Sequence, residues 1–166
     1  KKGKEAAISH TASLATNYKV YSGAFKQAKI KHLNSITEAL NLEKENLISK
    51  LKGKKIAILT NAGGAGALLA DNLASKDFKI FGPKDLLGTA KPIDYARTLH
   101  RIKGHYDNII VILTPQSMSD PANTARELVI SHHRNKIIAV FLGNKSMKAA
   151  KQILEKNNIP FFSRAV

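Results

Sequence analysis

Two stretches of this sequence carry residues that could do chemistry on a phosphate group, and the first is Ser9-His10-Thr11. A neutral imidazole can accept a phosphoryl group reversibly by nucleophilic attack. A single histidine in a polar stretch is nevertheless more often a solvent-exposed side chain with no catalytic role. Taken alone, His10 is therefore a candidate nucleophile with a plain structural alternative.

The second stretch is the glycine-rich segment 60–66, Thr-Asn-Ala-Gly-Gly-Ala-Gly, which follows an apolar run. Glycines between a strand and a helix let backbone N–H groups approach an anion, and the helix N-terminus adds partial positive charge. The segment is not a P-loop, because no Gly-Lys-Ser/Thr follows, and its glycine spacing differs from the dinucleotide fingerprint. Two interpretations stay open: a phosphate site formed by Asn61, Ala62, Gly63 and Gly64, or a tight structural turn.

Other kinds of site find little support in the sequence. The chain has no cysteine, which excludes disulfides, Cys-ligated zinc and thiol catalysis. No group of His, Asp and Glu residues has the spacing of metal ligands, so we predict no metal ligands in this chain. The serines lack the nucleophile-elbow pattern, which disfavours hydrolase chemistry.

The charge of the chain is its main compositional anomaly, since 27 Lys and Arg residues against 12 Asp and Glu residues give a net charge of +15 over 166 residues. Such a balance favours polyanionic partners such as nucleic acid, nucleotides, CoA or an anionic membrane. The excess is spread along the whole chain and no nucleic-acid-binding motif is present, which argues against nucleic acid. No apolar run is long enough to span a membrane. We expect a cytoplasmic location.

The elements that must position these residues alternate between strands and helices after about residue 53. The run 109–113 is continuous and β-branched, as in a parallel sheet covered on both faces. The alternation predicts an α/β domain with a doubly wound parallel sheet, in which ligands bind beyond the carboxyl ends of the strands. The further strands are expected at 56–59, 137–142 and 159–162, with a short one at 78–81, and the helices at 65–73, at 95–102, from Asp120-Pro121 onward, and from a Ser146 cap to 154.

Before this boundary the apolar spacing is helical. Residues 20–28 place Val, Tyr, Ala and Phe on one helical face, and 35–42 and 47–51 continue with the same periodicity. We therefore divide the chain into a helical N-terminal arm, residues 1–52, and an α/β domain, residues 53–166.

Several motifs then occur in the order found in one enzyme family. The run from Ser9 to Ala15, followed by Tyr21-x-x-Ala24-Phe25-x-Gln27-Ala28, resembles the phosphohistidine segment of the ADP-forming (NDP-forming) acyl-CoA synthetases, relatives of succinyl-CoA synthetase. The glycine-rich segment followed by Ala70-Asp71 resembles their second strand–loop–helix motif. Residues 82–88, 113–121 and 153–160 match further motifs of the family, so the resemblance covers nearly the whole chain.

The resemblance implies a fragment of a larger ligase. Residues 1–52 would hold the phosphohistidine segment and the end of a preceding ligase domain, and residues 53–166 a flavodoxin-like domain of the succinyl-CoA-ligase type. The CoA-binding and ATP-grasp domains would lie elsewhere, on the same polypeptide or on a partner subunit of an oligomeric enzyme.

The implied reaction is acyl-CoA + Pi + ADP ⇌ carboxylic acid + CoA + ATP, with Mg²⁺ as cofactor. His10 would be the phosphorylated nucleophile, and the helix that opens at 62–64 would hold the phosphohistidine. Two departures stand out: Ala12 replaces a usual Gly and Ala65 a common Pro. The chain is also shorter than the family between Leu73 and Gly82, which leaves a second strand hard to place.

Two alternatives remain at this point. The first is a non-catalytic sensor or scaffold copy of the same domain, of the kind fused to an acetyltransferase; the presence of His10 favours the enzyme. The second is a basic nucleic-acid-binding module, which rests on the net charge alone.

Overall fold

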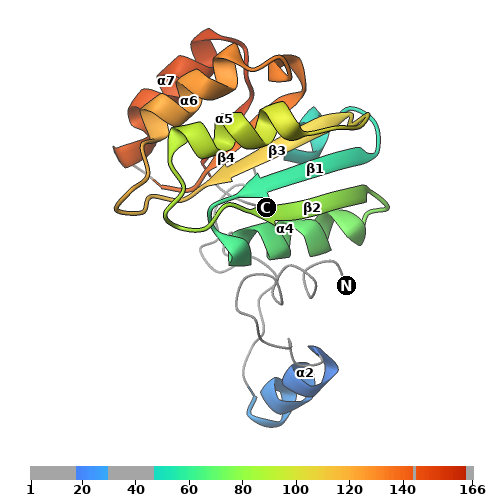
Figure 1. Cartoon of the computed structure of the whole chain (residues 1–166). Coiled ribbons are helices and arrows are strands. Elements are labelled where there is room, and N and C mark those ends of the chain that lie inside the picture. Colours follow the sequence, from blue (N-terminus) through green and yellow to red (C-terminus); the bar gives the residue numbers. More distant parts are fainter. Residues whose placement is uncertain (1–17, 30–46, 144, 164–166) are drawn as a thin grey trace.

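The computed structural model describes residues 18–29, 47–143 and 145–163, most of which form a five-stranded parallel sheet with helices on both faces (Figure 1). The strand order is β2-β1-β3-β4-β5, and every neighbouring pair is parallel. This is the order of flavodoxin-like doubly wound sheets. The predicted fold class is therefore confirmed. The strands are β1 (Lys55–Thr60), β2 (Lys79–Asp85), β3 (Asn108–Leu113), β4 (Ile137–Phe141) and β5 (Phe161–Phe162).

The helices lie on the two faces of the sheet unequally. Figure 1 shows α4 below the sheet and α5, α6 and α7 above it. The connection from β1 to β2 crosses the sheet in the opposite direction to the later connections, so right-handed crossovers place its helix on the opposite face. The α-helices of this domain are α4 (Gly63–Ala74), α5 (Pro92–Arg101), α6 (Pro121–Ile130) and α7 (Lys148–Lys156), and the 3₁₀ turns are η1 (Leu47–Lys50), η2 (Arg134–Lys136) and η3 (Lys145–Met147).

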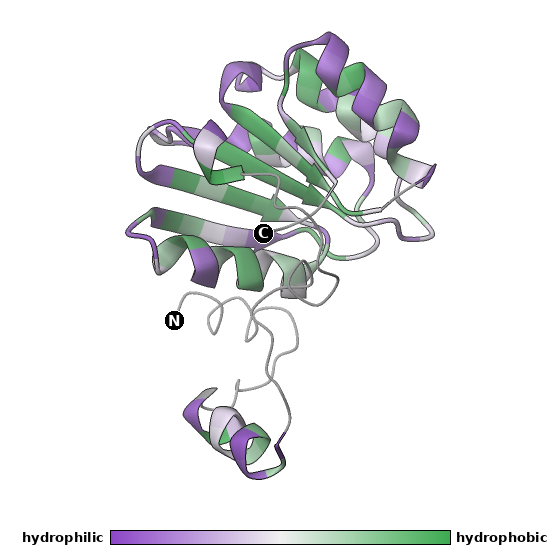
Figure 2. Cartoon of the chain, turned by 180° about the vertical axis from the view of Figure 1, so that it is seen from behind, coloured by the Kyte–Doolittle hydropathy of each residue, from purple (hydrophilic) through white to green (hydrophobic). Residues whose placement is uncertain are grey.

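The core consists of two apolar clusters, one on each face of the sheet. Successive residues of β3 alternate between them: Ile109 and Val111 belong to one cluster, Ile110 and Ile112 to the other. Figure 2 shows the central strands as continuously hydrophobic, which is the pattern expected of a parallel sheet buried on both sides.

The first turns of two helices test the capping predictions. Asp120 accepts a hydrogen bond from the Asn123 N–H at 3.0 Å and Pro121 occupies the first helical position, as predicted. The prediction that Ser146 caps the next helix is wrong, because Ser146 lies inside η3 and α7 begins at Lys148 without a side-chain cap. Met147 is buried in the core, so apolar packing rather than capping sets this start.

The edge strand β2 is longer than the sequence predicts. The expected strand at 78–81 continues through Gly82 and Pro83 to Asp85, and the pairing with β1 shifts register between Ala57 and Leu59. Proline is tolerated in edge strands and at irregularities of this kind. Only residues 75–78 separate the end of α4 from the start of β2.

The N-terminal part contributes α2 (Tyr18–Gln27), which agrees with the helical face predicted for 20–28. Val20 and Tyr21 on this helix are exposed. The predicted turns at 47–51 form the single 3₁₀ turn η1, whose Leu47 is completely buried in the core of the α/β domain. The predicted helix at 35–42 lies outside the described residues.

Candidate functional site

The two central strands, β1 and β3, form the topological switch point of the sheet. The chain leaves β1 toward β2 and leaves β3 toward β4, so the two connections diverge at the carboxyl ends of the strands, which is where sheets of this kind bind ligands. The loop after β1 is the glycine-rich segment that sequence analysis identified. The loop after β3 is residues 114–119, which the sequence placed at the same edge.

The side chain of Asn61 joins these two loops. Its Oδ1 accepts hydrogen bonds from the N–H and the hydroxyl of Thr114, at 2.8 and 3.3 Å. Its Nδ2 donates to the Thr114 carbonyl at 3.0 Å and to Ser119 Oγ at 3.3 Å. Because Asn61 is 2% exposed and all its amide atoms are engaged, the side chain acts as a clasp between the loops. A contact from Asn61 to phosphate remains a prediction.

The local sequence does not predict the clasp. Asn61 is more than fifty positions away from Thr114 and Ser119, and no local sequence pattern predicts that they form hydrogen bonds. A usable signal was present, however, because an amide and a hydroxyl directly follow neighbouring parallel strands.

Beyond the clasp, α4 begins with backbone donors that the helix itself leaves unpaired. Ala62 is the N-cap and provides no side-chain cap, and its own N–H donates to Thr60 Oγ1 at 2.9 Å. The N–H groups of Gly63, Gly64 and Ala65 have no acceptor among the described residues. Together with the helix dipole they form a positively polarised surface suited to an anion.

Two glycines of this helix have different roles. A Cβ on Gly66 would lie 2.8 Å from Thr60 Cγ2 and 3.1 Å from Pro83 Cβ, so the missing side chain lets α4 approach the sheet closely. A Cβ on Gly64 would meet nothing within 4 Å. Gly66 therefore serves packing, whereas Gly64 borders open space at the start of the helix.

The loop after β3 is held by its own side chains. Ser119 Oγ accepts from the Gln116 N–H at 3.1 Å and donates to the Thr114 carbonyl at 3.1 Å. Gln116 Nε2 donates to Thr114 Oγ1, also at 3.1 Å. Gly88, in the loop after β2, lies beside the Gln116 side chain. Three loops therefore meet around the switch point.

Lysines add positive charge at the same edge of the sheet. Lys145, Lys148 and Lys151 line a pocket of about 310 Å³ near the ends of β4 and β5. Lys151 also lies 3.7 Å from Glu155 and 5.9 Å from the ring centre of Phe161. The carboxyl edge is thus cationic beyond the helix N-terminus itself.

The proposed nucleophile His10 lies outside the described residues. Its role as nucleophile stays a prediction. Three of the described histidines lie together at the ends of α5 and α6: the ring centres of His100 and His132 are 6.0 Å apart, and those of His132 and His133 are 3.9 Å apart. Burial and the neighbouring His132 lower the pKa of His133. In the part of the chain that the structure describes, no group of His, Asp and Glu residues could hold a metal ion. No described helix is long and apolar enough to cross a membrane.

No family model matches the chain. Comparison with curated proteins is more informative. The ADP-forming acetate–CoA ligase of Methanocaldococcus jannaschii is 32% identical over 96% of this chain, and ADP-forming acetate–CoA ligase I of Archaeoglobus fulgidus is 30% identical, also over 96%. The chain belongs to the ADP-forming acyl-CoA synthetase family. The alpha subunit of ADP-forming acetate–CoA ligase II of Pyrococcus furiosus is 29% identical over 98% of this chain.

This member of the ADP-forming acyl-CoA synthetase family spans less than half the length of the curated relatives it matches. It covers 42% of the P. furiosus alpha subunit, 27% of the M. jannaschii ligase and 26% of the A. fulgidus ligase. The alignment with the P. furiosus subunit extends over 191 positions, more than the 166 residues of this chain, so the subunit contains segments that this chain lacks.

Solved structures agree with the observed fold of this synthetase-family chain. A crystal structure of a Pyrococcus horikoshii OT3 protein superposes with a TM-score of 0.60 at 28% identity, over 91% of this chain and 41% of that protein. The dinucleotide-forming acetyl-coenzyme A synthetase 1 of Ca. Korarchaeum cryptofilum, in complex with phosphate and ADP, also gives 0.60, at 21% identity, over 98% of this chain and 41% of that protein.

Proposed function

We propose that this chain is the phosphohistidine-bearing part of an ADP-forming acyl-CoA ligase. The whole enzyme would interconvert acyl-CoA, phosphate and ADP with carboxylic acid, CoA and ATP. Family membership supports this function, since the curated relatives are named as ADP-forming acetate–CoA ligases. The geometry supports it independently, because α4 begins at the switch point of the sheet with unpaired N–H groups that suit an anion.

The reaction divides into three balanced steps. Phosphate attacks the thioester carbonyl and displaces CoA, which leaves an acyl phosphate. An imidazole nitrogen of His10 then attacks the phosphorus of the acyl phosphate, and the carboxylate leaves. Finally the terminal phosphate oxygen of ADP attacks the phosphohistidine, which forms ATP and regenerates the imidazole.

The residues described here would stabilise the phosphoryl group while it is on His10. The N–H groups of Gly63, Gly64 and Ala65 are directed by the helix and need no rearrangement to bind an anion. The Asn61 clasp fixes the start of α4 against the loop after β3. Phosphoryl transfer depends mainly on positioning and charge stabilisation, which this arrangement provides.

The remaining functions belong to other parts of the enzyme. CoA and the nucleotide would bind to domains or subunits outside this chain, and Mg²⁺ would accompany the nucleotide there. The small carboxylic acid would bind beside them. We propose an oligomeric enzyme and a cytoplasmic location.

The observation that carries this proposal is the uncapped start of α4 at the switch point, in a chain that also contains the Ser9-His10-Thr11 motif. It is tested by ATP formation from acetyl-CoA, phosphate and ADP in the complete enzyme. We expect His10→Gln to reduce ATP formation to the background of the assay, while His105→Gln, a change at an exposed histidine, leaves it unchanged. Wild-type rates in His10→Gln would exclude His10 as the nucleophile.

A further inference from the structure

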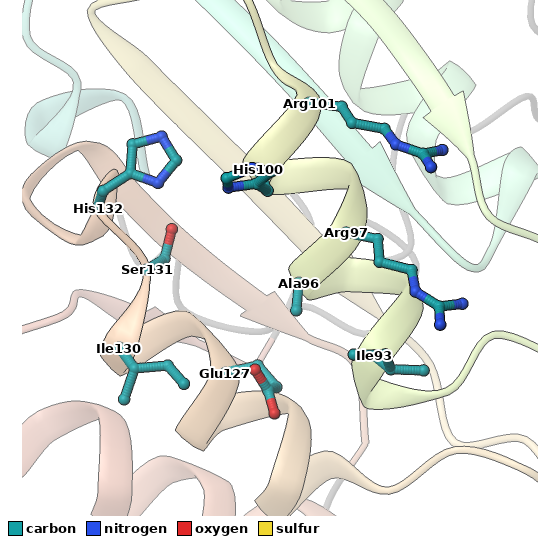
Figure 3. Close-up of a pocket in the computed structure, with 9 residues that line it drawn as sticks. All are labelled: Ile93, Ala96, Arg97, His100, Arg101, Glu127, Ile130, Ser131 and His132. Carbon is teal, nitrogen blue, oxygen red and sulfur yellow. The ribbon is translucent and has the colours of Figure 1, made fainter.

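A groove between α5 and α6 lies on the face of the domain opposite to α4, away from the glycine-rich loop (Figure 1). Its volume is about 510 Å³. Figure 3 shows residues of both helices around it, with Ala96 on α5 and Glu127 on α6. The small side chain of Ala96 leaves the space between the helices open.

The groove exposes apolar surface that nothing in the described chain covers. Ile130, at the end of α6, is 76% exposed, the largest fraction among the large apolar side chains of the described residues. Ile93, in the first turn of α5, is 47% exposed. Apolar side chains gathered at a groove are typical of interaction surfaces, whereas scattered ones are not.

The charged residues of the groove also differ from those of the rest of the chain. Of the 27 Lys and Arg residues, only five are Arg, yet two of these five, Arg97 and Arg101, line the groove and no Lys does. Figure 3 shows both side chains extending from the same side of α5, the side turned away from α6. Arginine is enriched and lysine depleted in protein–protein interfaces.

The lining holds one carboxylate, that of Glu127 on α6, beside these two arginines, so it carries an excess of positive charge as well as apolar side chains. His100 and His132 also line the groove. A complementary partner must therefore combine apolar side chains with Asp or Glu. A segment of protein fits this description better than nucleic acid does, because the exposed Ile93 and Ile130 offer apolar surface that phosphate groups do not match.

We propose that the α5–α6 groove docks an acidic, partly apolar segment of the same ligase that lies outside this chain. This inference rests on the proposed function, which places the CoA and nucleotide sites on other domains or subunits. The curated relatives are more than twice as long as this chain, so a complete enzyme has ample protein to occupy the groove. Docking here would leave the glycine-rich edge accessible.

The test is site-specific photo-cross-linking in the complete enzyme. A benzophenone amino acid replaces Ile130 in one variant and Leu68 in the control, since Leu68 is 61% exposed on α4 at the other face. We expect the probe at 130, and not that at 68, to cross-link to an Asp- or Glu-containing peptide outside residues 1–166. Cross-links from 130 only to a second copy of this chain, to nucleic acid, or to nothing would overturn the proposal.

Charge reversal provides a second readout on the same samples. Arg97→Glu combined with Arg101→Glu should lower the cross-link yield at 130 by about tenfold or more, as expected when interface hot spots are removed. Arg126→Glu, an exposed change on α6, should leave the yield unchanged. An unaltered yield in the double variant would contradict the role of the arginines.

Phosphorylation of His10 separates this proposal from the proposed function. If position 130 forms no cross-link while His10 is phosphorylated normally, the docking proposal is contradicted and the proposed function is not. Cross-links to the acidic segment in an enzyme that never forms phosphohistidine would support docking and contradict the proposed reaction.

Discussion

At the switch point, the side chain of Asn61 satisfies all its hydrogen-bonding capacity on the loop after β3. The neighbouring N–H groups of Gly63 and Gly64 lack acceptors among the described residues. The two kinds of residue therefore have different roles: the asparagine fixes the loops, and the glycines contribute backbone N–H groups that the helix leaves unpaired.

The change Asn61→Asp should destabilise the domain by about 1–3 kcal/mol, because the aspartate cannot donate to the Thr114 carbonyl or to Ser119 Oγ in the buried clasp. Urea denaturation measures the loss. The same change at exposed Asn135 is the control and should alter stability little. Equal stability of both variants would show that the clasp does not hold the loops together.

The glycines of α4 allow packing and function to be separated. Gly66→Ala should cost about 1–3 kcal/mol, since its Cβ would overlap Thr60 and press on Pro83. Gly64→Ala has open space and should be neutral, or stabilising by up to about 1 kcal/mol through helix propensity. Gly64→Ala should nevertheless slow phosphorylation of His10, because the added methyl group stands beside the anion-binding donors. Thermal unfolding and phosphorylation rates together check both expectations.

Elements differ in how far the sequence determines them. The strands β1, β3 and β4 follow continuous apolar runs, and their bounds lie within a residue or two of those predicted. The extent of β2 and the start of α7 were not predictable in the same way, because register and core packing decide them rather than local pattern. The Asn61 clasp and the α5–α6 groove likewise depend on segments that only the tertiary fold brings together.

Asp107 holds the start of β1. Its carboxylate accepts hydrogen bonds from the N–H groups of Lys55 at 2.8 Å and Lys54 at 2.9 Å. The Lys55 bond is the main cause that lowers the pKa of Asp107. A carboxylate with a lowered pKa in the folded state stabilises the fold above its ordinary pKa of about 3.9 and loses that effect as pH falls through its folded-state pKa.

Asp107→Asn should therefore lower the urea midpoint at pH 7, and its difference from wild type should shrink as the pH falls below about 3.9. Glu155→Gln is the control, because this exposed residue pairs with Lys151 on the surface and should change stability little at either pH. If the difference in urea midpoint between wild type and Asp107→Asn does not change with pH, the charge of Asp107 does not stabilise the start of β1.

At the scale of the whole molecule, the α/β unit extends further toward the N-terminus than the composition boundary near residue 53. Leu47 is completely buried among residues of β1, α4 and β3. Lys52 adds two hydrogen bonds to the side chain of Asn108. The division of the chain between residues 52 and 53 stays a prediction, and the packed core of the α/β domain includes η1.

Leu47→Ala should destabilise the domain by about 2–5 kcal/mol, the usual cost of emptying a filled core site. Val20→Ala on exposed α2 should have little effect, because the Val20 side chain is 62% exposed. Chemical denaturation compares the two. An unchanged midpoint for Leu47→Ala would mean that η1 is dispensable for the α/β core.

The central claim is that this chain carries a phosphoryl group on His10 during the ligase reaction. Its most direct test is to incubate the complete enzyme with radiolabelled ATP, and separately with acetyl-CoA and radiolabelled phosphate, and to map the label. We predict acid-labile, base-stable phosphate on His10 from both directions, and none in His10→Gln. If the complete wild-type enzyme never acquires this label from either direction, the phosphohistidine account is contradicted.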